Sequence, residues 1–106
     1  MTEPQFITPD WPAPAKVRAA VTTRVGGVSH APYDTFNLAT HVGDDPAALR
    51  ENRTRLRTTL ALPTEPVWLK QVHGVAVVDA AQGDVEPEAD GAFAAQSGAV
   101  CAVLTA

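Results

Sequence analysis

The sequence has few cysteines and contains no long apolar run. Its single cysteine, Cys101, cannot form an internal disulfide, which excludes a disulfide framework and is typical of a reducing compartment. No apolar stretch approaches the roughly 20 residues that a membrane-spanning helix needs, and the N-terminus lacks the basic flank and apolar run of a secretory signal. The composition therefore predicts a cytoplasmic protein without membrane partners.

Basic residues are also fewer than acidic ones. Eight Lys and Arg residues against twelve Asp and Glu residues give a formal net charge of −4 at pH 7. Nucleic acids and anionic membranes require clustered positive charge, so this balance argues against both as partners. The basic cluster at residues 50–57 falls on a predicted helix, and we interpret it as a solvated face.

The sequence does contain enough apolar residues for one small domain. Hydrophobic residues make up 45% of the 106 residues and charged residues 19%, which argues against disorder. Residues 1–15 contain four prolines and are predicted to be an extended lead-in, not a central strand. Residues 17–23 are rich in β-branched side chains and predict a strand, and residues 24–44 predict a long loop because glycine and proline interrupt them.

A helix is predicted to follow this loop. Asp45 supplies a side-chain acceptor at the cap, and the fixed backbone of Pro46 suits the first helical position. Pro63 is predicted to end the helix. One apolar face is expected at helical spacing, formed by Leu49, Leu56 and Leu60.

The second half of the chain is predicted to be rich in strands. Residues 67–72 and 75–79 are expected to form strands, and residues 83–90 an acidic, exposed segment. Residues 99–106 are nearly all apolar and end without turn residues, which favours a fragment cut within a core strand over a strand that pairs at the terminus. Cys101 is then expected to pack as a small hydrophobe. Together the elements predict an α+β domain with a mixed sheet.

Histidines and a glycine pair are the candidates for chemistry. His73 follows an apolar strand and precedes Gly74, where a neutral imidazole could bind zinc, but spacing alone shows no further ligand. His41 lies near Asn37 in a segment that also fits a simple loop with Asx turns. Gly26 and Gly27, with Arg24, lack the motif of a nucleotide P-loop; they form either a structural turn or a loop around an anionic ligand.

Several longer motifs occur in a fixed order: T-T-R-V-G-G-V-S, P-Y-D-T-F-N-L, H-V-G-D-D, E-N-R, P-V-W-L-K-Q-V-H-G, A-D-G and C-A-V-L-T-A. In this order, over residues 11–106, they resemble the first half of the YfiH-type family. Its members were once labelled polyphenol oxidases or laccases. They are now associated with purine nucleoside phosphorylase and adenosine deaminase activity, and with peptidoglycan editing. The resemblance implies a layered α+β sandwich, of which residues 1–106 are the N-terminal part of a single domain.

The resemblance also implies a zinc site. The family ligands are a His in Q-x-H-G, a Cys in A-D-C and a later His. The first matches His73, which is thereby implied to be both catalytic residue and metal ligand, whereas Cys101 does not match the second and A-D-C would begin at Ala106. We therefore expect these 106 residues to be inactive by themselves. Copper is not expected, because several copper centres would need more imidazoles than the three present.

The implied partners are small molecules, a purine nucleoside and phosphate, and the oligomeric state is left open. An amidase that edits peptidoglycan precursors is the enzymatic alternative, and a binding module that uses the Gly26–Gly27 loop is the non-enzymatic one. The residues available to orient a substrate are Arg24, Asn37, His41, Arg53 and Gln71.

Overall fold

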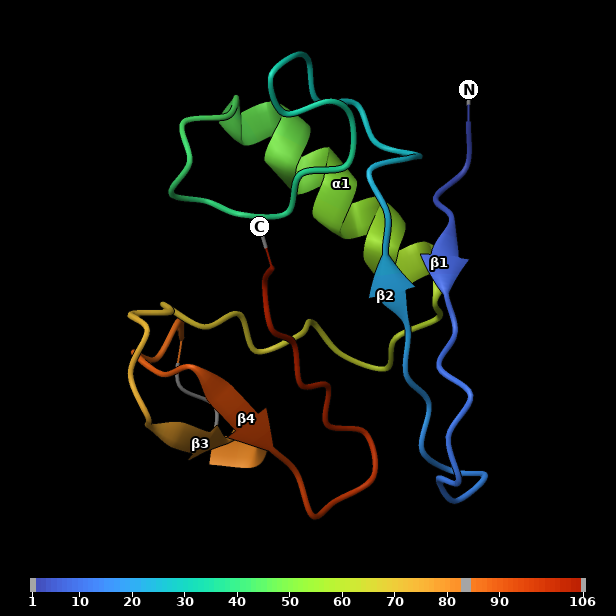
Figure 1. Cartoon of the computed structure of the whole chain (residues 1–106), viewed down its shortest axis with the longest axis vertical. Helices are drawn as coiled ribbons and strands as arrows, with labels where there is room; N and C mark the ends of the chain where they lie inside the picture. Colours follow the sequence, from blue (N-terminus) through green and yellow to red (C-terminus); the bar gives the residue numbers. More distant parts are fainter. Residues whose placement is uncertain (1, 83–84, 106) are drawn as a thin grey trace. The chain divides into compact units, whose positions relative to one another are not determined.

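The computed structural model describes residues 2–82 and 85–105 of the chain. These residues fall into two compact units, Met1–Thr59 and Leu60–Ala106. The first unit contains a strand pair and the α-helix, and the second contains the other strand pair. Figure 1 follows the chain through these elements. An antiparallel pair, a parallel pair and one α-helix confirm the α+β class, and the described pairings form two separate two-stranded sheets.

The strands of the first unit are short. β1, Phe6–Ile7, pairs in antiparallel fashion with β2, Val21–Thr22, so that Phe6 lies opposite Thr22. Most of the predicted lead-in is irregular, as expected for its prolines, but β1 forms between two of them. The strand predicted over residues 17–23 is reduced to β2, because only these residues meet a paired segment.

The helix α1 comprises Pro46–Thr59 and begins where the sequence predicts. The backbone N–H of Ala47 donates to Asp45 Oδ1 at 3.2 Å, which confirms Asp45 as the N-cap. The helix ends four residues before Pro63, and Ala61 then adopts a left-handed φ of 51°. Its buried face is formed by Ala48, Leu49, Asn52 and Leu56.

The second unit is built from parallel pairings. β3, Val77–Asp79, pairs with β4, Gly91–Phe93, and a 3₁₀-helix over Ala80–Gln82 follows β3. The strand predicted over residues 67–72 is wrong in extent, because only isolated bridges form there, Val67 with Cys101 and Lys70 with Glu88. The apolar core of this unit consists of Trp68, Leu69, Ala80 and Ala89.

One burial prediction for the second unit is wrong, and a second holds in part. Cys101 is exposed, because residues 99–105 pair with the rest of the unit at one bridge and no described layer covers the thiol. In the segment predicted to be acidic and exposed, Val85, Glu86 and Glu88 are exposed as expected, whereas Ala89 is fully buried. Gly83 and Asp84 of that segment lie outside the described residues.

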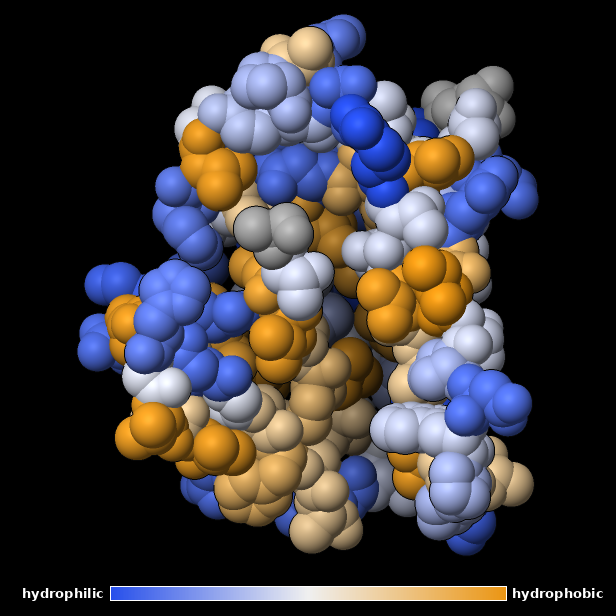
Figure 2. Space-filling view, in the orientation of Figure 1, coloured by the Kyte–Doolittle hydropathy of each residue, from blue (hydrophilic) through white to orange (hydrophobic). Residues whose placement is uncertain are grey.

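Apolar side chains also lie at the surface. Hydrophobic residues alternate with hydrophilic ones on the face seen in Figure 2, and Val75 and Val85 are 98% and 92% exposed. Within residues 2–82 and 85–105, no helix combines the length and the hydrophobicity that crossing a membrane requires.

Candidate functional site

A loop between two parallel pairing points carries His73. Lys70 pairs with Glu88, and Val77 pairs with Gly91. Six residues thus separate the two points on the first segment, from 71 to 76, but only residues 89 and 90 separate them on the second. The surplus residues must leave the pairing plane, and they form the loop over residues 71–76.

The carboxylate of Asp90 holds this loop. Asp90 Oδ1 accepts the backbone N–H groups of Val72 at 3.1 Å and His73 at 2.8 Å, and Asp90 Oδ2 accepts that of Gly74 at 2.7 Å. The bond from Gly74, followed by those from His73 and Val72, lowers the pKa of Asp90 from its ordinary value. The ionised carboxylate therefore stabilises the loop, since donors to a carboxylate favour its charged form.

The backbone of His73 is unusual. Its φ of 59° lies in the left-handed region, which non-glycine residues rarely adopt. The side chain is exposed, and its imidazole donates no hydrogen bond to the described part of the chain. The loop therefore fixes the main chain of His73, whose side chain is exposed.

Gln71, at the start of the same loop, forms hydrogen bonds with the C-terminal segment of the chain. Its Nε2 donates to the carbonyl oxygen of Leu104 at 3.0 Å, and its Oε1 accepts the N–H of Leu104 at 2.7 Å. The side-chain amide thus pairs with one residue of the C-terminal segment as a neighbouring strand would. In this structure Gln71 fixes the start of the loop, and both polar groups of its side chain are occupied.

Asn52 of α1 anchors the long loop in the first unit. Its side chain is fully buried and donates to Ser29 Oγ and to the carbonyl oxygen of Asn37, both at 2.8 Å. Its Oδ1 accepts the N–H of Val28 at 2.8 Å. Residues 24–44, predicted as one loop, contain no helix or strand, and the loop runs beside α1 (Figure 1). The hydrogen bonds of Asn52 attach it to the helix.

Asp44 continues the same network. Its carboxylate accepts the hydroxyl of Ser29 at 2.6 Å, Nδ2 of Asn37 at 3.1 Å and the N–H of Asp45 at 2.8 Å. The hydrogen bond from Ser29 contributes most to lowering the pKa of Asp44. Asn37, one of the residues proposed to orient substrate, is therefore held inside the loop.

The glycine pair is packed against its own chain. A Cβ at Gly27 would lie 2.1 Å from the carbonyl oxygen of Thr35 and 2.6 Å from Asn52 Oδ1. Gly26 has a φ of 106°, and a Cβ there would lie 2.2 Å from Pro4. Close approach of the backbone accounts for both glycines, which favours the structural turn over a ligand loop.

The remaining residues proposed to orient substrate lie in the first unit. Arg24 forms an ion pair with Asp34 at 3.2 Å, in which the two side chains are 75% and 44% exposed. Arg53 donates twice to the carbonyl oxygen of Leu38, at 3.0 and 2.8 Å. His41 is exposed. The structure therefore joins Asn37 and Arg53 to the same loop and leaves Arg24 and His41 at the surface.

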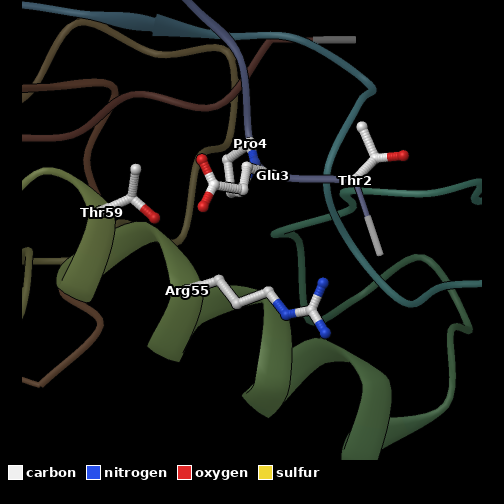
Figure 3. Close-up of a pocket in the computed structure, with 5 residues that line it drawn as sticks. All are labelled: Thr2, Glu3, Pro4, Arg55 and Thr59. Atoms are coloured by element: carbon white, nitrogen blue, oxygen red, sulfur yellow. The ribbon is translucent and has the colours of Figure 1, made fainter.

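A shallow cavity of about 300 Å³ also lies in the first unit. It is lined by Thr2, Glu3, Pro4, Arg55 and Thr59 (Figure 3). Arg55 already donates to Glu51 and to the carbonyl oxygen of Gly26. None of the residues proposed from the sequence lines this cavity.

Sequence reasoning missed Asp90 and Asn52, although both stand in motifs that the sequence shows, A-D-G and E-N-R. Asn52 could have been found, because it interrupts the apolar face between Leu49 and Leu56 at helical spacing. Asp90 bonds to residues that lie 16 to 18 positions earlier, so no local pattern marks it.

The described residues do not form a zinc site on their own. No group of three His, Cys, Asp or Glu side chains suited to a metal occurs within them. His73 offers one imidazole, and the nearby carboxylate of Asp90 is engaged by backbone N–H groups. One imidazole is fewer than the three protein ligands of catalytic zinc.

Comparison with known proteins supports the resemblance that the motifs indicate. Residues 18–106 match the family described as multi-copper polyphenol oxidoreductase laccase. The chain is 55% identical over 101 residues to purine nucleoside phosphorylase PA4543 of Pseudomonas aeruginosa, covering 95% of this chain and 40% of that protein. It is 46% identical over 103 residues to purine nucleoside phosphorylase YfiH of Escherichia coli, covering 96% and 42%.

Solved structures show the same similarity. Protein NMB0706 of Neisseria meningitidis matches with a TM-score of 0.87 and 46% identity, over 95% of this chain and 41% of that one. YlmD of Geobacillus stearothermophilus matches with a TM-score of 0.78 and 30% identity, over 96% and 45%. The chain spans about two-fifths of the length of the curated relatives that it matches.

Proposed function

The chain belongs to the multi-copper polyphenol oxidoreductase laccase family, and on this premise we propose that it is part of an enzyme acting on purine nucleosides, with His73 as a catalytic residue. The names of the relatives from P. aeruginosa and E. coli support a purine nucleoside phosphorylase. The observation that carries the role of His73 is its loop, in which three backbone N–H groups bind Asp90 and the imidazole is exposed.

The proposed reaction is phosphorolysis of the glycosidic bond. An oxygen of phosphate forms a bond to C1′ of the ribose while the bond from C1′ to the purine nitrogen breaks. The electron pair leaves with the base, which takes up a proton. This proton comes from water or from another group of the full-length protein, because an imidazole that binds zinc uses the lone pair of a ring nitrogen for the metal and is not a proton donor near neutral pH.

His73 is also proposed as the one zinc ligand that this chain supplies. The other ligands would come from the part of the protein that the relatives have and this chain does not span. With a single candidate imidazole in the loop, residues 1–106 alone are expected to bind zinc weakly and to be inactive.

Arg24 is the proposed phosphate contact of the first unit. Its ion pair with Asp34 is largely exposed, and exposed pairs of this kind contribute little to stability, so phosphate can replace the carboxylate. His41 is a further proposed substrate contact because its side chain is exposed. Asn37, Arg53 and Gln71 are proposed to act by holding their loops.

The test is the products formed by the full-length protein from adenosine and phosphate. Phosphorolysis yields adenine and ribose 1-phosphate, whereas deamination would yield inosine and ammonia. His73→Ala is expected to lower phosphorolysis on the order of 100-fold, because it removes one of the proposed zinc ligands. His30→Ala, which removes another exposed imidazole, is the matched control and should retain the wild-type rate.

Three results would overturn the proposal. These are failure of the full-length protein to consume nucleosides, nucleoside consumption that does not depend on phosphate, and a folded His73→Ala variant with the wild-type rate. Hydrolysis of a muramyl precursor in the absence of nucleoside turnover would instead favour the peptidoglycan amidase.

A further inference from the structure

We propose that Asp90 is a positioning residue for His73, and that its carboxylate determines where the imidazole points by fixing the main chain of residues 72–74. The inference rests on the proposed catalytic role of His73. It assigns to Asp90 no contact with substrate. Asp90 acts through the backbone of the loop, because its carboxylate accepts hydrogen bonds from the backbone N–H groups of Val72, His73 and Gly74.

The first argument is the conformation that the carboxylate maintains. A left-handed φ at a residue with a side chain is sterically unfavourable, and surrounding interactions must compensate for it. At His73 the compensation is visible, since its N–H lies 2.8 Å from Asp90 Oδ1 and the next N–H lies 2.7 Å from Oδ2. The direction of the Cα–Cβ bond follows from the backbone, so the same contacts fix the direction in which the side chain of His73 leaves the main chain.

The second argument is that Asp90 is itself held in place. Ala89, next to it, is fully buried, and the N–H of Ala89 donates to the carbonyl oxygen of Lys70 at 3.2 Å. The N–H of Asp90 donates to the carbonyl oxygen of Ala76 at 3.0 Å, and Gly91 begins β4. The carboxylate therefore extends from a fixed main chain into the middle of the loop.

The third argument is the use of a charge. Gly74, His73 and Val72 present three donors within a short arc, and a carboxylate can accept all of them. An asparagine has the same shape, but its NH₂ group would face N–H donors. Asp90→Asn therefore replaces one of the two acceptor oxygens by a donor, and removes the negative charge, without creating a cavity.

The experiment combines a spectroscopic measurement with a double-mutant cycle in the full-length protein. In protein labelled with ¹⁵N-histidine, the amide resonance of His73 and its HN–Hα coupling report the hydrogen bond and φ. Asp90→Asn should shift the resonance upfield and change the coupling. Asp79→Asn is the matched control: its carboxylate accepts the N–H of Ala81 at 2.9 Å in the same unit, and both signals of His73 should stay at their wild-type values.

The kinetic arm separates positioning from general stabilisation. Asp90→Asn should lower kcat for phosphorolysis on the order of 100-fold, as expected when a catalytic group is displaced by about 1 Å, with little change in KM. In a His73→Ala background the same substitution should lower kcat no further, because Asp90 acts through His73. Asp79→Asn should leave kcat unchanged in both backgrounds.

The proposal is overturned if the folded Asp90→Asn variant keeps the wild-type His73 signals. It is also overturned if Asp90→Asn lowers kcat equally with and without His73. Should this variant fail to fold, Asp90→Ser, whose hydroxyl accepts fewer of the three donors, replaces it with the same expected outcomes. If the wild type does not process nucleosides, the proposed function fails, and the His73 signals still decide whether Asp90 sets the loop.

Discussion

Two loops of this chain are held by the same device in opposite environments. In the first unit, Asn52 extends from α1 and binds backbone and side-chain groups of the loop over residues 24–44. In the second unit, Asp90 extends from the residue before β4 and binds the loop over residues 71–76. Asn52 is neutral and fully buried, whereas the contacts of Asp90 are exposed.

The difference shows what each loop is built for. A neutral amide both donates and accepts, and it can be buried once its hydrogen bonds are satisfied. The loop around Asn52 consequently uses its polar groups internally. A carboxylate binds N–H groups more strongly but is costly to bury without partners, so it suits a surface loop. The loop around Asp90 leaves an imidazole exposed, and we therefore expect stability to depend on the first loop and activity on the second.

The largest effect on stability is expected from Asn52→Ala. The substitution leaves the N–H of Val28 and the carbonyl of Asn37 without their buried partner, which should cost about 3 kcal/mol. Urea denaturation measures the loss. Arg50→Ala, at an exposed position of the same helix, is the control and should change stability by less than about 0.5 kcal/mol. Equal effects of the two substitutions would show that the buried network does not hold this unit.

A smaller, pH-dependent effect is expected from Asp44. Its pKa is lowered in the folded chain, chiefly by the hydroxyl of Ser29, so its stabilisation is present above the unfolded pKa of about 3.9. That stabilisation is lost as the pH falls through the folded pKa. The stability difference between wild type and Asp44→Asn, measured in urea, should therefore be largest near pH 6 and shrink below about pH 4. A difference that stays constant over this range would contradict the ionised role of Asp44.

The smallest effect is expected from Arg24→Gln. The ion pair with Asp34 is exposed on both sides, and such pairs contribute about 0–1 kcal/mol. Thermal unfolding should therefore differ little from wild type, while the KM for phosphate in the full-length protein should rise. A large loss of stability would place Arg24 with Asn52 among the residues that hold the first loop.

The parts of the fold that depend on neighbouring residues could be predicted from the sequence. Asp45 and Pro46 define the start of α1 because capping acts within one turn. Strand extents could not be predicted, since residues 17–23 and 67–72 have strand composition but meet paired segments at only a few positions. An apolar sequence also does not reveal whether other elements cover it in the fold. Burial was therefore expected for Cys101, which is exposed.

The residues of the candidate site also differ in whether the sequence could predict them. His73 is recognisable from its motif, and its position in this exposed loop is compatible with the proposed role. The residues that hold the loop of His73 could not be predicted from the sequence. Asp90 and Gln71 form hydrogen bonds with residues 16 to 33 positions away along the chain. Such contacts exist only after two distant segments pair, and no spacing in the sequence encodes them.

The pairing of Gln71 with Leu104 has a consequence for which substitutions position 71 can accept. Its side chain must donate with one terminal atom and accept with the other, at the distance that a glutamine spans. Glutamate has no donor when ionised, leucine and methionine offer neither function, and asparagine is one methylene shorter. Among functional variants of this protein, glutamine should therefore be retained at position 71 even where the surrounding residues of the loop diverge.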